Sequence, residues 1–492
     1  MKKFILAIDQ GTSSTKTLVF DAEGKAIAKG DAPLYTNYFD NGFVEQDPEE
    51  IFQNVLLSVK KCLAAFREKG YSENEIVGIG ISNQRETFVI WDKYGKPLHP
   101  AIVWQCKRSV GICDELIKKG LSETVKQKTG LVIDPYFSAT KLIWLCQNNE
   151  IVGDAILSGK AWFGTIDSWL LYRFTGGQVH ATDHTNASRT LFFNLHTQSW
   201  DNELINTFGL KGLHLPEIKT SSSYFGDTML EGILKKPVPI AAMIGDSHAA
   251  AFGEGCFGAG TAKATLGTGC SVLMNTGNKP VPSKSGMVTT VCWSMKGRID
   301  YALEGVIVSC GATIEWLKNQ LGIFTENSAT EEMALSVADN GGIYLVPAFS
   351  GLGSPHWQMQ RRASITGINF STTKNHIVRA ALESIPYQIK DVIAAMEVDA
   401  GLSLKELMTD GGITANGFVM QFLADVLDKR VVTIGMPDVS ALGAGYLAGL
   451  SLGLYADLNS IIKLNASKHS YLPEPWNRAQ VYYKRWQEEI NR

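Results

Sequence analysis

The sequence predicts an α/β protein built from two similar halves. Over residues 4–81, short apolar strands precede and follow a segment with helical spacing of its apolar residues, an order typical of mixed α/β layers. A strand interrupted by glycine and hydroxyl residues opens the chain and recurs at residues 263–274, which indicates a duplicated architecture. With 492 residues the chain is too long for one ordinary core, so we expect domains at 1–252 and 253–492.

Strands and one long helix account for the beginning of the chain. Apolar runs predict strands at residues 4–8, 17–20 and 26–28, with tight turns between them. Apolar residues recur at helical spacing over residues 49–66, and the run 76–81 returns to a strand. We therefore expect a helix that packs on a sheet.

The second half of the chain has a similar order of predicted strands and helices. Residues 263–274 predict two strands around a turn of Gly267, Thr268 and Gly269. Residues 405–434 have the order strand, glycine-rich turn, helix and strand, which is typical of a βαβ unit. A helix is predicted over residues 377–396, and Pro386 within it is expected to bend or weaken the helix.

Composition excludes several classes of partner. The formal net charge of −3 offers no field that would attract nucleic acid or an anionic membrane. The N-terminal apolar run meets Asp9 too early for an export or membrane-spanning segment, so we expect a cytoplasmic protein. The eight cysteines form no C-x-x-C pair and are interpreted as reduced packing residues, and we expect no metal cage made by protein side chains alone.

Three turns at strand ends combine glycine with hydroxyl or amide side chains, at residues 9–16, 267–271 and 410–416. Each is either an ordinary turn or a cradle for phosphate, since glycine lets the backbone approach an anion closely. Two of them at matching places in the two halves favour a nucleotide phosphate held between domains. The G-x-G-x-x-G at residues 253–258 follows a helix and precedes a strand, the reverse of a dinucleotide site.

Four residues are candidates for binding and chemistry. Arg85 and Glu86 follow a predicted strand. They are either a solvated ion pair on the surface, or a binding site for vicinal hydroxyls in which Arg85 donates and Glu86 accepts hydrogen bonds. Trp104 is either an apolar wall for a carbon chain or a core indole. Asp246, between an apolar strand and an alanine-rich helix, is interpreted as a helix N-cap, as the acceptor of a proton from an attacking hydroxyl, or as both.

The chain resembles the FGGY family of carbohydrate kinases, and within it the glycerol kinases. The similar stretches include IDQGTSSTK, SNQRETFVIWD, LGTGCSVLMNTG and DGGITANGFVMQF, and they extend from residue 4 to about residue 450. This resemblance implies a two-domain, actin-like ATPase fold of the ribonuclease H type. Each half would be a mixed sheet with flanking helices, and ATP and substrate would meet in the cleft between the halves.

The resemblance also implies roles for single residues. Asp246 would be the catalytic base, and Asp9 would bind Mg²⁺ through water. The residues implied for substrate binding are Arg85, Glu86, Trp104, Tyr136, Asp246, Ser247 and Ser271. Those implied for nucleotide binding are Thr12, Ser13, Ser14, Lys16, Gly267, Thr268, Gly311, Glu315, Gly412 and Asn416.

The expected function is that of an ATP-dependent kinase acting on a terminal hydroxyl of a small polyol, with glycerol as the first candidate. Ser247 and Ser271 stand where glycerol kinases usually carry Gln and Phe, so a longer polyol or a ketose is an alternative substrate. A sensor that binds nucleotide and polyol without turnover is a second alternative, against which Asp9, Asp246 and the phosphate turns argue. A homodimer or homotetramer is also expected.

Overall fold

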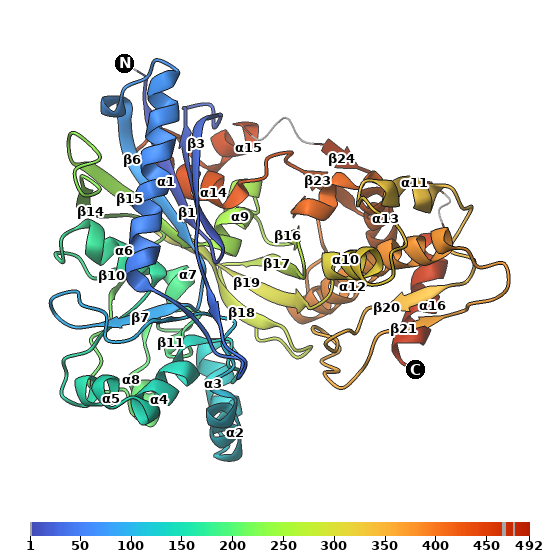
Figure 1. Cartoon of the computed structure of the whole chain (residues 1–492), viewed down its shortest axis with the longest axis horizontal. Coiled ribbons are helices and arrows are strands. Elements are labelled where there is room, and N and C mark those ends of the chain that lie inside the picture. Colours follow the sequence, from blue (N-terminus) through green and yellow to red (C-terminus); the bar gives the residue numbers. More distant parts are fainter. Residues whose placement is uncertain (1, 465–468, 476–477) are drawn as a thin grey trace.

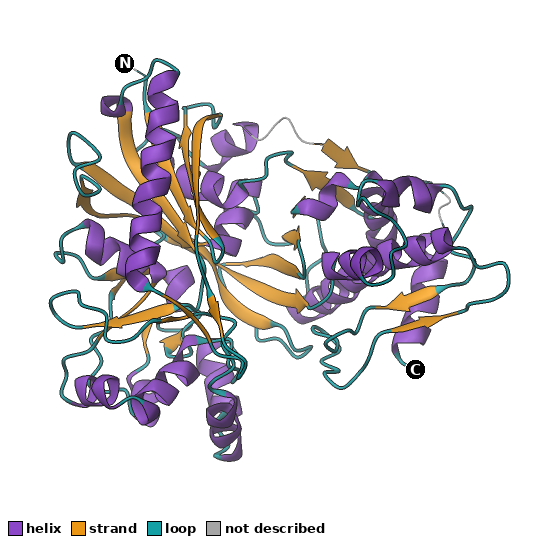
Figure 2. Ribbon diagram, viewed as in Figure 1, coloured by secondary structure: helices purple, strands orange, loops and turns teal. Residues whose placement is uncertain are grey.

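Two mixed sheets with helices on their faces organise the molecule (Figure 1, Figure 2). The computed structural model describes residues 2–464, 469–475 and 478–492. The first sheet has the order β14-β15-β6-β1-β2-β3, with β1 at Phe4–Gln10, β2 at Ser14–Phe20, β3 at Ala26–Pro33, β6 at Ile76–Asn83, β14 at Ser222–Thr228 and β15 at Val238–Gly245. The second has the order β18-β19-β17-β16-β22-β23-β24, with β16 at Thr261–Leu266, β17 at Cys270–Gly277, β18 at Val288–Met295, β19 at Arg298–Ile307, β22 at Glu406–Asp410, β23 at Arg430–Thr433 and β24 at His469–Tyr471.

The two sheets share one strand topology. In the first, β1 pairs antiparallel with β2 across a short turn and parallel with β6. In the second, β16 pairs antiparallel with β17 and parallel with β22. The predicted repeat of a strand-turn-strand unit is therefore confirmed, and the βαβ order of β22, α13 (Gly417–Leu427) and β23 is confirmed as well, since β22 and β23 are parallel.

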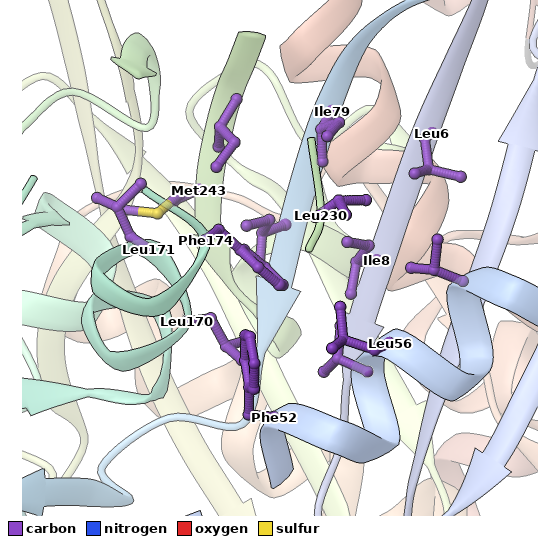
Figure 3. Close-up of a cluster of buried hydrophobic side chains, with 14 of the residues drawn as sticks. Leu6, Ile8, Phe52, Leu56, Ile79, Leu170, Leu171, Phe174, Leu230 and Met243 are labelled. Atoms are coloured by element: carbon purple, nitrogen blue, oxygen red, sulfur yellow. The ribbon is translucent and has the colours of Figure 1, made fainter. Parts of the chain in front are cut away.

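Helix α1 (Pro48–Glu68) covers one face of the first sheet. It begins at the N-cap Asp47, whose side chain accepts the Glu49 N–H, and it has proline in its first turn, where the ring is tolerated. Its apolar face and that of α6 (Ile166–Phe174) bury against the strands, as Figure 3 shows for Leu6, Ile8, Ile79, Met243, Phe52, Leu56, Leu170 and Phe174. Each such side chain stabilises the fold by about 1.5–3 kcal/mol.

A third, smaller sheet lies at one end of the first half (Figure 1). It has the order β4-β5-β8-β7-β9, with β4 at Asn37–Tyr38, β5 at Val44–Gln46, β7 at Phe88–Trp91, β8 at Ala101–Ile102 and β9 at Trp162–Thr165. Helices α2 (Val110–Lys118), α3 (Ser122–Thr129), α4 (Ser138–Asn148) and α5 (Glu150–Leu157) belong to this part. It was not anticipated from the sequence, and the segments on either side of α2 and α3 carry Trp104 and Tyr136.

Two helices join the halves. Helix α9 (Asp246–Glu254) follows the last strand of the first half, and α14 (Val439–Ser451) follows β23 but packs against α9, β1 and β6. The two helices approach so closely that a Cβ at Gly443 would collide with the Ala249 carbonyl, which is why glycine is required there. The predicted domain boundary at 252/253 lies within α9 and stays a prediction.

The long helix α12 (Lys374–Ala400) confirms the helix predicted over 377–396. It continues through Pro386 as one helix, because Ile385, Ile389 and Val392 are buried in the second core and hold the segment in place. Among the described residues the cysteines form no disulfide, and all but Cys146 are buried, which confirms their interpretation as reduced packing residues. Within the described ranges, none of the helices has the length and apolar character that crossing a bilayer requires.

Candidate active site

The glycine turn of the second half at residues 267–269 contacts the start of helix α10 (Gly311–Asn319). The Gly267 carbonyl accepts the Gly311 N–H at 2.9 Å, where α10 begins. A Cβ on Gly311 would lie 2.7 Å from the Gly267 oxygen, so this approach needs glycine. The Thr268 carbonyl accepts the Ala312 N–H at 3.0 Å, while its side chain is exposed. The N–H groups of Gly311 and Ala312 thus hold the turn against the start of α10, and the positive end of the α10 dipole lies beside the turn.

The third turn leads into α13. Gly412 opens a short 3₁₀ segment, Gly412–Ala415, and no neighbour would meet a Cβ on it. Asn416 is the N-cap of α13, and its Oδ1 accepts the Val419 N–H at 3.1 Å. On α10, the Glu315 carboxylate accepts hydrogen bonds from the Asn327 and Asn319 amides, which lower its pKa. These residues lie at adjacent helix starts, as a nucleotide site would require.

The first turn connects to the rest of the site through its side chains. The Thr12 hydroxyl accepts the Trp104 Nε1–H at 2.9 Å and donates to Gln84 Oε1 at 3.3 Å, so it links the turn to Trp104 and Gln84. Ser13 is exposed, and the Ser14 carbonyl accepts the Gly11 N–H at 3.0 Å. The Lys16 Nζ lies 3.2 Å from a carboxylate oxygen of Asp438, just before α14.

Asp9 is the last but one residue of β1, beside this turn. Its Oδ1 accepts a hydrogen bond from Ser82 Oγ at 2.7 Å, yet burial raises the pKa of Asp9 to about 6. Among the residues that the structure describes, no group of three or more acidic, histidine or cysteine side chains could hold a metal ion. Mg²⁺ is usually held by one or two carboxylates with waters and substrate phosphates, and Asp9 fits that mode.

Arg85 and Glu86 belong to a buried charge network. Arg85 is 7% exposed and Glu86 is 1% exposed, so the alternative of a solvated surface pair is wrong. Arg85 Nη1 donates to both oxygens of Glu304, at 3.0 and 3.2 Å, and Glu86 accepts from Arg189 Nε at 2.6 Å. Glu86 also has a φ of 61°, a left-handed conformation that costs a non-glycine residue of order 1–3 kcal/mol and is found preferentially at functional sites.

The network shifts the protonation of its members. Burial raises the pKa of Glu86, and the guanidinium of Arg189 only partly opposes this. Burial also acts to raise the pKa of Glu304, but Arg189 and Arg85 together bring it well below the ordinary range of a carboxyl group. The two guanidinium groups therefore favour the charged form of Glu304 at the centre of the site.

Two aromatic rings stand beside the network. The rings of Trp104 and Tyr136 meet edge to face, with centroids 5.6 Å apart and planes at 80°, and the Arg189 guanidinium lies 5.6 Å from the Tyr136 ring centroid. The loop that carries Tyr136 is held by Lys141, whose buried ammonium donates to the carbonyls of residues 135, 136 and 137 at 2.6, 2.7 and 3.0 Å. Both rings are partly buried, which suits an apolar wall with a polar rim.

Asp246 is the first residue of α9, not its N-cap. Gly245 occupies the cap position, and it is glycine because a Cβ there would lie 2.7 Å from Arg85 Cγ and Cδ. Asp246 Oδ1 accepts the Ser247 N–H at 2.6 Å and the Arg85 Nε–H at 3.2 Å. Its side chain is 38% exposed, in contrast to the buried charges behind it. A carboxylate held at one oxygen and open on its other side can accept a proton.

The second sheet contributes Ser271 to the same place. Its Oγ donates to Glu304 Oε1 at 3.1 Å. Arg189 and Glu304 were not singled out in the sequence, although Glu304 is a single charge in the apolar run 301–308 of β19. A charge inside an apolar run of a strand needs a buried partner, and this signal could have drawn attention to Glu304. The buried Oγ of Ser247 has no hydrogen-bond partner among the described residues.

Comparisons with known proteins agree with this geometry. Residues 4–253 match the model of the N-terminal domain of the FGGY family of carbohydrate kinases, and residues 262–452 match that of the C-terminal domain. The chain is 44% identical to glycerol kinase of Carboxydothermus hydrogenoformans over 493 residues, which cover 100% of this chain and 98% of that protein. It is also 44% identical to glycerol kinase 2 of Thermotoga maritima over 492 residues, with the same coverage.

Solved structures match over the same length. The crystal structure of Plasmodium falciparum glycerol kinase with ADP aligns with a TM-score of 0.94 and 34% identity, covering 100% of this chain and 98% of that one. A ligand-bound xylulose kinase from Lactobacillus acidophilus aligns with a TM-score of 0.88 over 99% and 98% of the chains, and at 22% identity it supports the fold alone. The predicted fold class, an actin-like ATPase with two mixed-sheet halves, is confirmed.

Proposed function

The chain belongs to the FGGY family of carbohydrate kinases, and we propose that it transfers the γ-phosphoryl group of ATP to a terminal hydroxyl of glycerol. The observation that carries this proposal is the half-exposed Asp246 carboxylate, fixed at one oxygen by Arg85 and by the first turn of α9. The relatives named as glycerol kinases support the choice of substrate.

Polyol binding would use the buried network. The outer N–H groups of Arg85 and the free oxygen of Glu86 would hold vicinal hydroxyls, and the rings of Trp104 and Tyr136 would contact the carbon chain. The terminal hydroxyl would then lie against Asp246. Holding the substrate in this way supplies the orientation on which kinase catalysis mainly depends.

The reaction is a single in-line displacement. The hydroxyl oxygen attacks the γ-phosphorus, the bond from that phosphorus to the β–γ bridging oxygen breaks, and the hydroxyl proton passes to Asp246. ADP leaves with the bridging oxygen. Bound Mg²⁺, the usual metal of kinases in this family, would neutralise charge on the β- and γ-phosphates, and Asp9 would hold it through water.

Nucleotide binding would use the turns at the strand ends. Thr12, Ser13, Ser14 and Lys16 would face the phosphates from the first half, and Gly267 with Thr268 from the second. The starts of α10 and α13, with Gly311, Glu315, Gly412 and Asn416, would hold the remaining part of the nucleotide. The positive ends of the α10 and α13 dipoles support this assignment.

A longer polyol or a ketose is the second candidate. The short Ser271 side chain favours it, because it reaches only to Glu304 where a larger residue would fill space. The deciding test is ADP release from Mg-ATP with glycerol, erythritol, threitol, xylitol, ribitol, xylulose and ribulose. We expect glycerol to give the highest kcat/KM. If none of them raises ADP release above background, the kinase proposal fails and the sensor remains. A homodimer or homotetramer and a cytoplasmic location stay predictions.

A further inference from the structure

Glu304 connects the two halves of the molecule at the substrate site. It lies on β19 of the second sheet and is 2% exposed, while the two guanidinium groups that contact it, Arg85 and Arg189, come from the first half. We propose that Glu304, with Arg189, is a positioning residue: it fixes the Arg85 guanidinium between polyol and Asp246, and ties polyol binding to the half that carries the second phosphate turn. This inference rests on the proposed kinase function.

Protein groups engage both oxygens of the Glu304 carboxylate. Oε1 accepts from Arg85 Nη1 at 3.0 Å and from Ser271 Oγ at 3.1 Å. Oε2 accepts from Arg85 Nη1 at 3.2 Å and lies 2.7 Å from Arg189 Nη1. Three hydrogen bonds and one ion pair thus engage both oxygens, and Glu304 is only 2% exposed. Glu304 therefore acts on the substrate only through its neighbours.

Charges alternate along the network, from Glu86 through Arg189, Glu304 and Arg85 to Asp246. Only Asp246 at the end is substantially exposed. Arg85 therefore has a carboxylate on each side, one buried and one at the reacting position, and its orientation is set by both. If Glu304 loses its charge, the guanidinium has Asp246 as its nearest carboxylate partner and can turn toward it, away from the polyol.

The strand pairing links Glu304 to the nucleotide side. On β17, Ser271 lies two residues beyond Gly269 of the second phosphate turn, and Leu273 pairs with Glu304 on β19. A change in the position of this turn therefore moves the contact between Glu304 and Arg85. Buried ion pairs are often replaceable without loss of stability, so stability alone does not explain four buried charges here.

The test compares a single with a charge-balanced double variant. Glu304→Gln leaves two guanidinium groups with one buried carboxylate, so it will lower Tm strongly. Arg189→Gln/Glu304→Gln removes one charge of each sign. We expect the double variant to recover most of the lost Tm, while KM for the polyol stays raised about 10-fold or more and KM for ATP stays within about threefold.

A matched control is available in α12. Arg379, which is 12% exposed, and the fully buried Glu383 form an i,i+4 ion pair at 2.9 Å in the second half, apart from the network. Arg379→Gln/Glu383→Gln removes the same two charges, and it should lower Tm without changing KM for the polyol. If the control raises KM for the polyol as much as Arg189→Gln/Glu304→Gln does, general distortion explains the result and the inference is wrong.

Two further outcomes would overturn the inference. One is that the Arg189→Gln/Glu304→Gln variant has the same KM for the polyol as the wild type. Glu304 would then only balance the charge of the guanidinium groups. The other is an equal rise in both KM values. The KM values are measured with the polyol that the wild type phosphorylates fastest. If the wild type phosphorylates none of the polyols, the proposed function fails. Calorimetric titration with glycerol then tests the inference on Glu304 separately. An unchanged Kd for glycerol in the double variant, or no binding of glycerol to the wild type, contradicts the inference.

Discussion

Replacing Asp246 by Asn separates its structural contacts from its proposed role as a base. An amide oxygen can still accept the Ser247 N–H and the Arg85 Nε–H, which now lie at 2.6 and 3.2 Å from Oδ1. An amide cannot accept a proton at neutral pH. The charges behind it, on Arg85, Arg189, Glu86 and Glu304, still sum to zero, so the substitution leaves no unbalanced buried charge.

The magnitudes of the two effects differ enough to be told apart. Because the Asp246 side chain is 38% exposed, its ion pair contributes at most about 1 kcal/mol, and its charge in the first turn of α9 about 0.3–1 kcal/mol. Tm should then fall by only a few degrees. Loss of a general base lowers kcat by roughly 10²- to 10⁴-fold, which corresponds to about 2.7–5.4 kcal/mol in the activation barrier.

The measurement is kcat with the best polyol, together with a nucleotide-binding titration and Tm. Nucleotide should bind Asp246→Asn as it binds the wild type, since the phosphate turns are unchanged. Asp457→Asn is the control, because Asp457 caps α15 (Leu458–Leu464) by accepting the Ser460 N–H at 2.8 Å and is exposed. A kcat of Asp246→Asn within about threefold of wild type would remove Asp246 from the mechanism.

Three other substitutions test the site from different sides. Arg85→Lys keeps the positive charge but loses the planar guanidinium fork. The fall in kcat/KM should correspond to a loss of about 1.5–3 kcal/mol of transition-state stabilisation. An unchanged KM for the polyol would show that Arg85 does not bind it. Ser271→Phe should raise the ratio of glycerol to five-carbon turnover about 10-fold, and a constant ratio would show that residue 271 does not face the substrate. Burial raises the pKa of Asp9 from 3.8 to about 6, so ionisation lowers the stability of the fold as pH rises between these values. In urea titrations at pH 4 and pH 7.5, the free energy of unfolding of Asp9→Asn should not show this loss of stability. The same substitution should abolish Mg²⁺-dependent turnover. Equal unfolding free energies of variant and wild type at both values would contradict this.

Local pattern was sufficient for most secondary structure. The apolar run at β1, the helical spacing of α1 and the strand-turn-helix-strand order around α13 follow from side-chain periodicity, and each is found where it was predicted. The small sheet β4-β5-β8-β7-β9 was missed, because its strands are as short as two residues and too short to show a period.

For the candidate site as well, some features follow from the sequence and others only from the tertiary structure. The sequence by itself determined which residues end the strands: Asp9, Arg85, the glycine turn at 267–269 and Asp246 all follow apolar runs. Only the tertiary structure decided what these residues contact. Arg85 donates a hydrogen bond to Glu304, which lies 219 positions later in the sequence. The N-cap of α9 is a glycine, Gly245, because the Arg85 side chain fills the space that a Cβ would need. Periodicity reports that a side chain is buried, whereas the partner of a buried charge depends on how two sheets pack, which no local pattern contains.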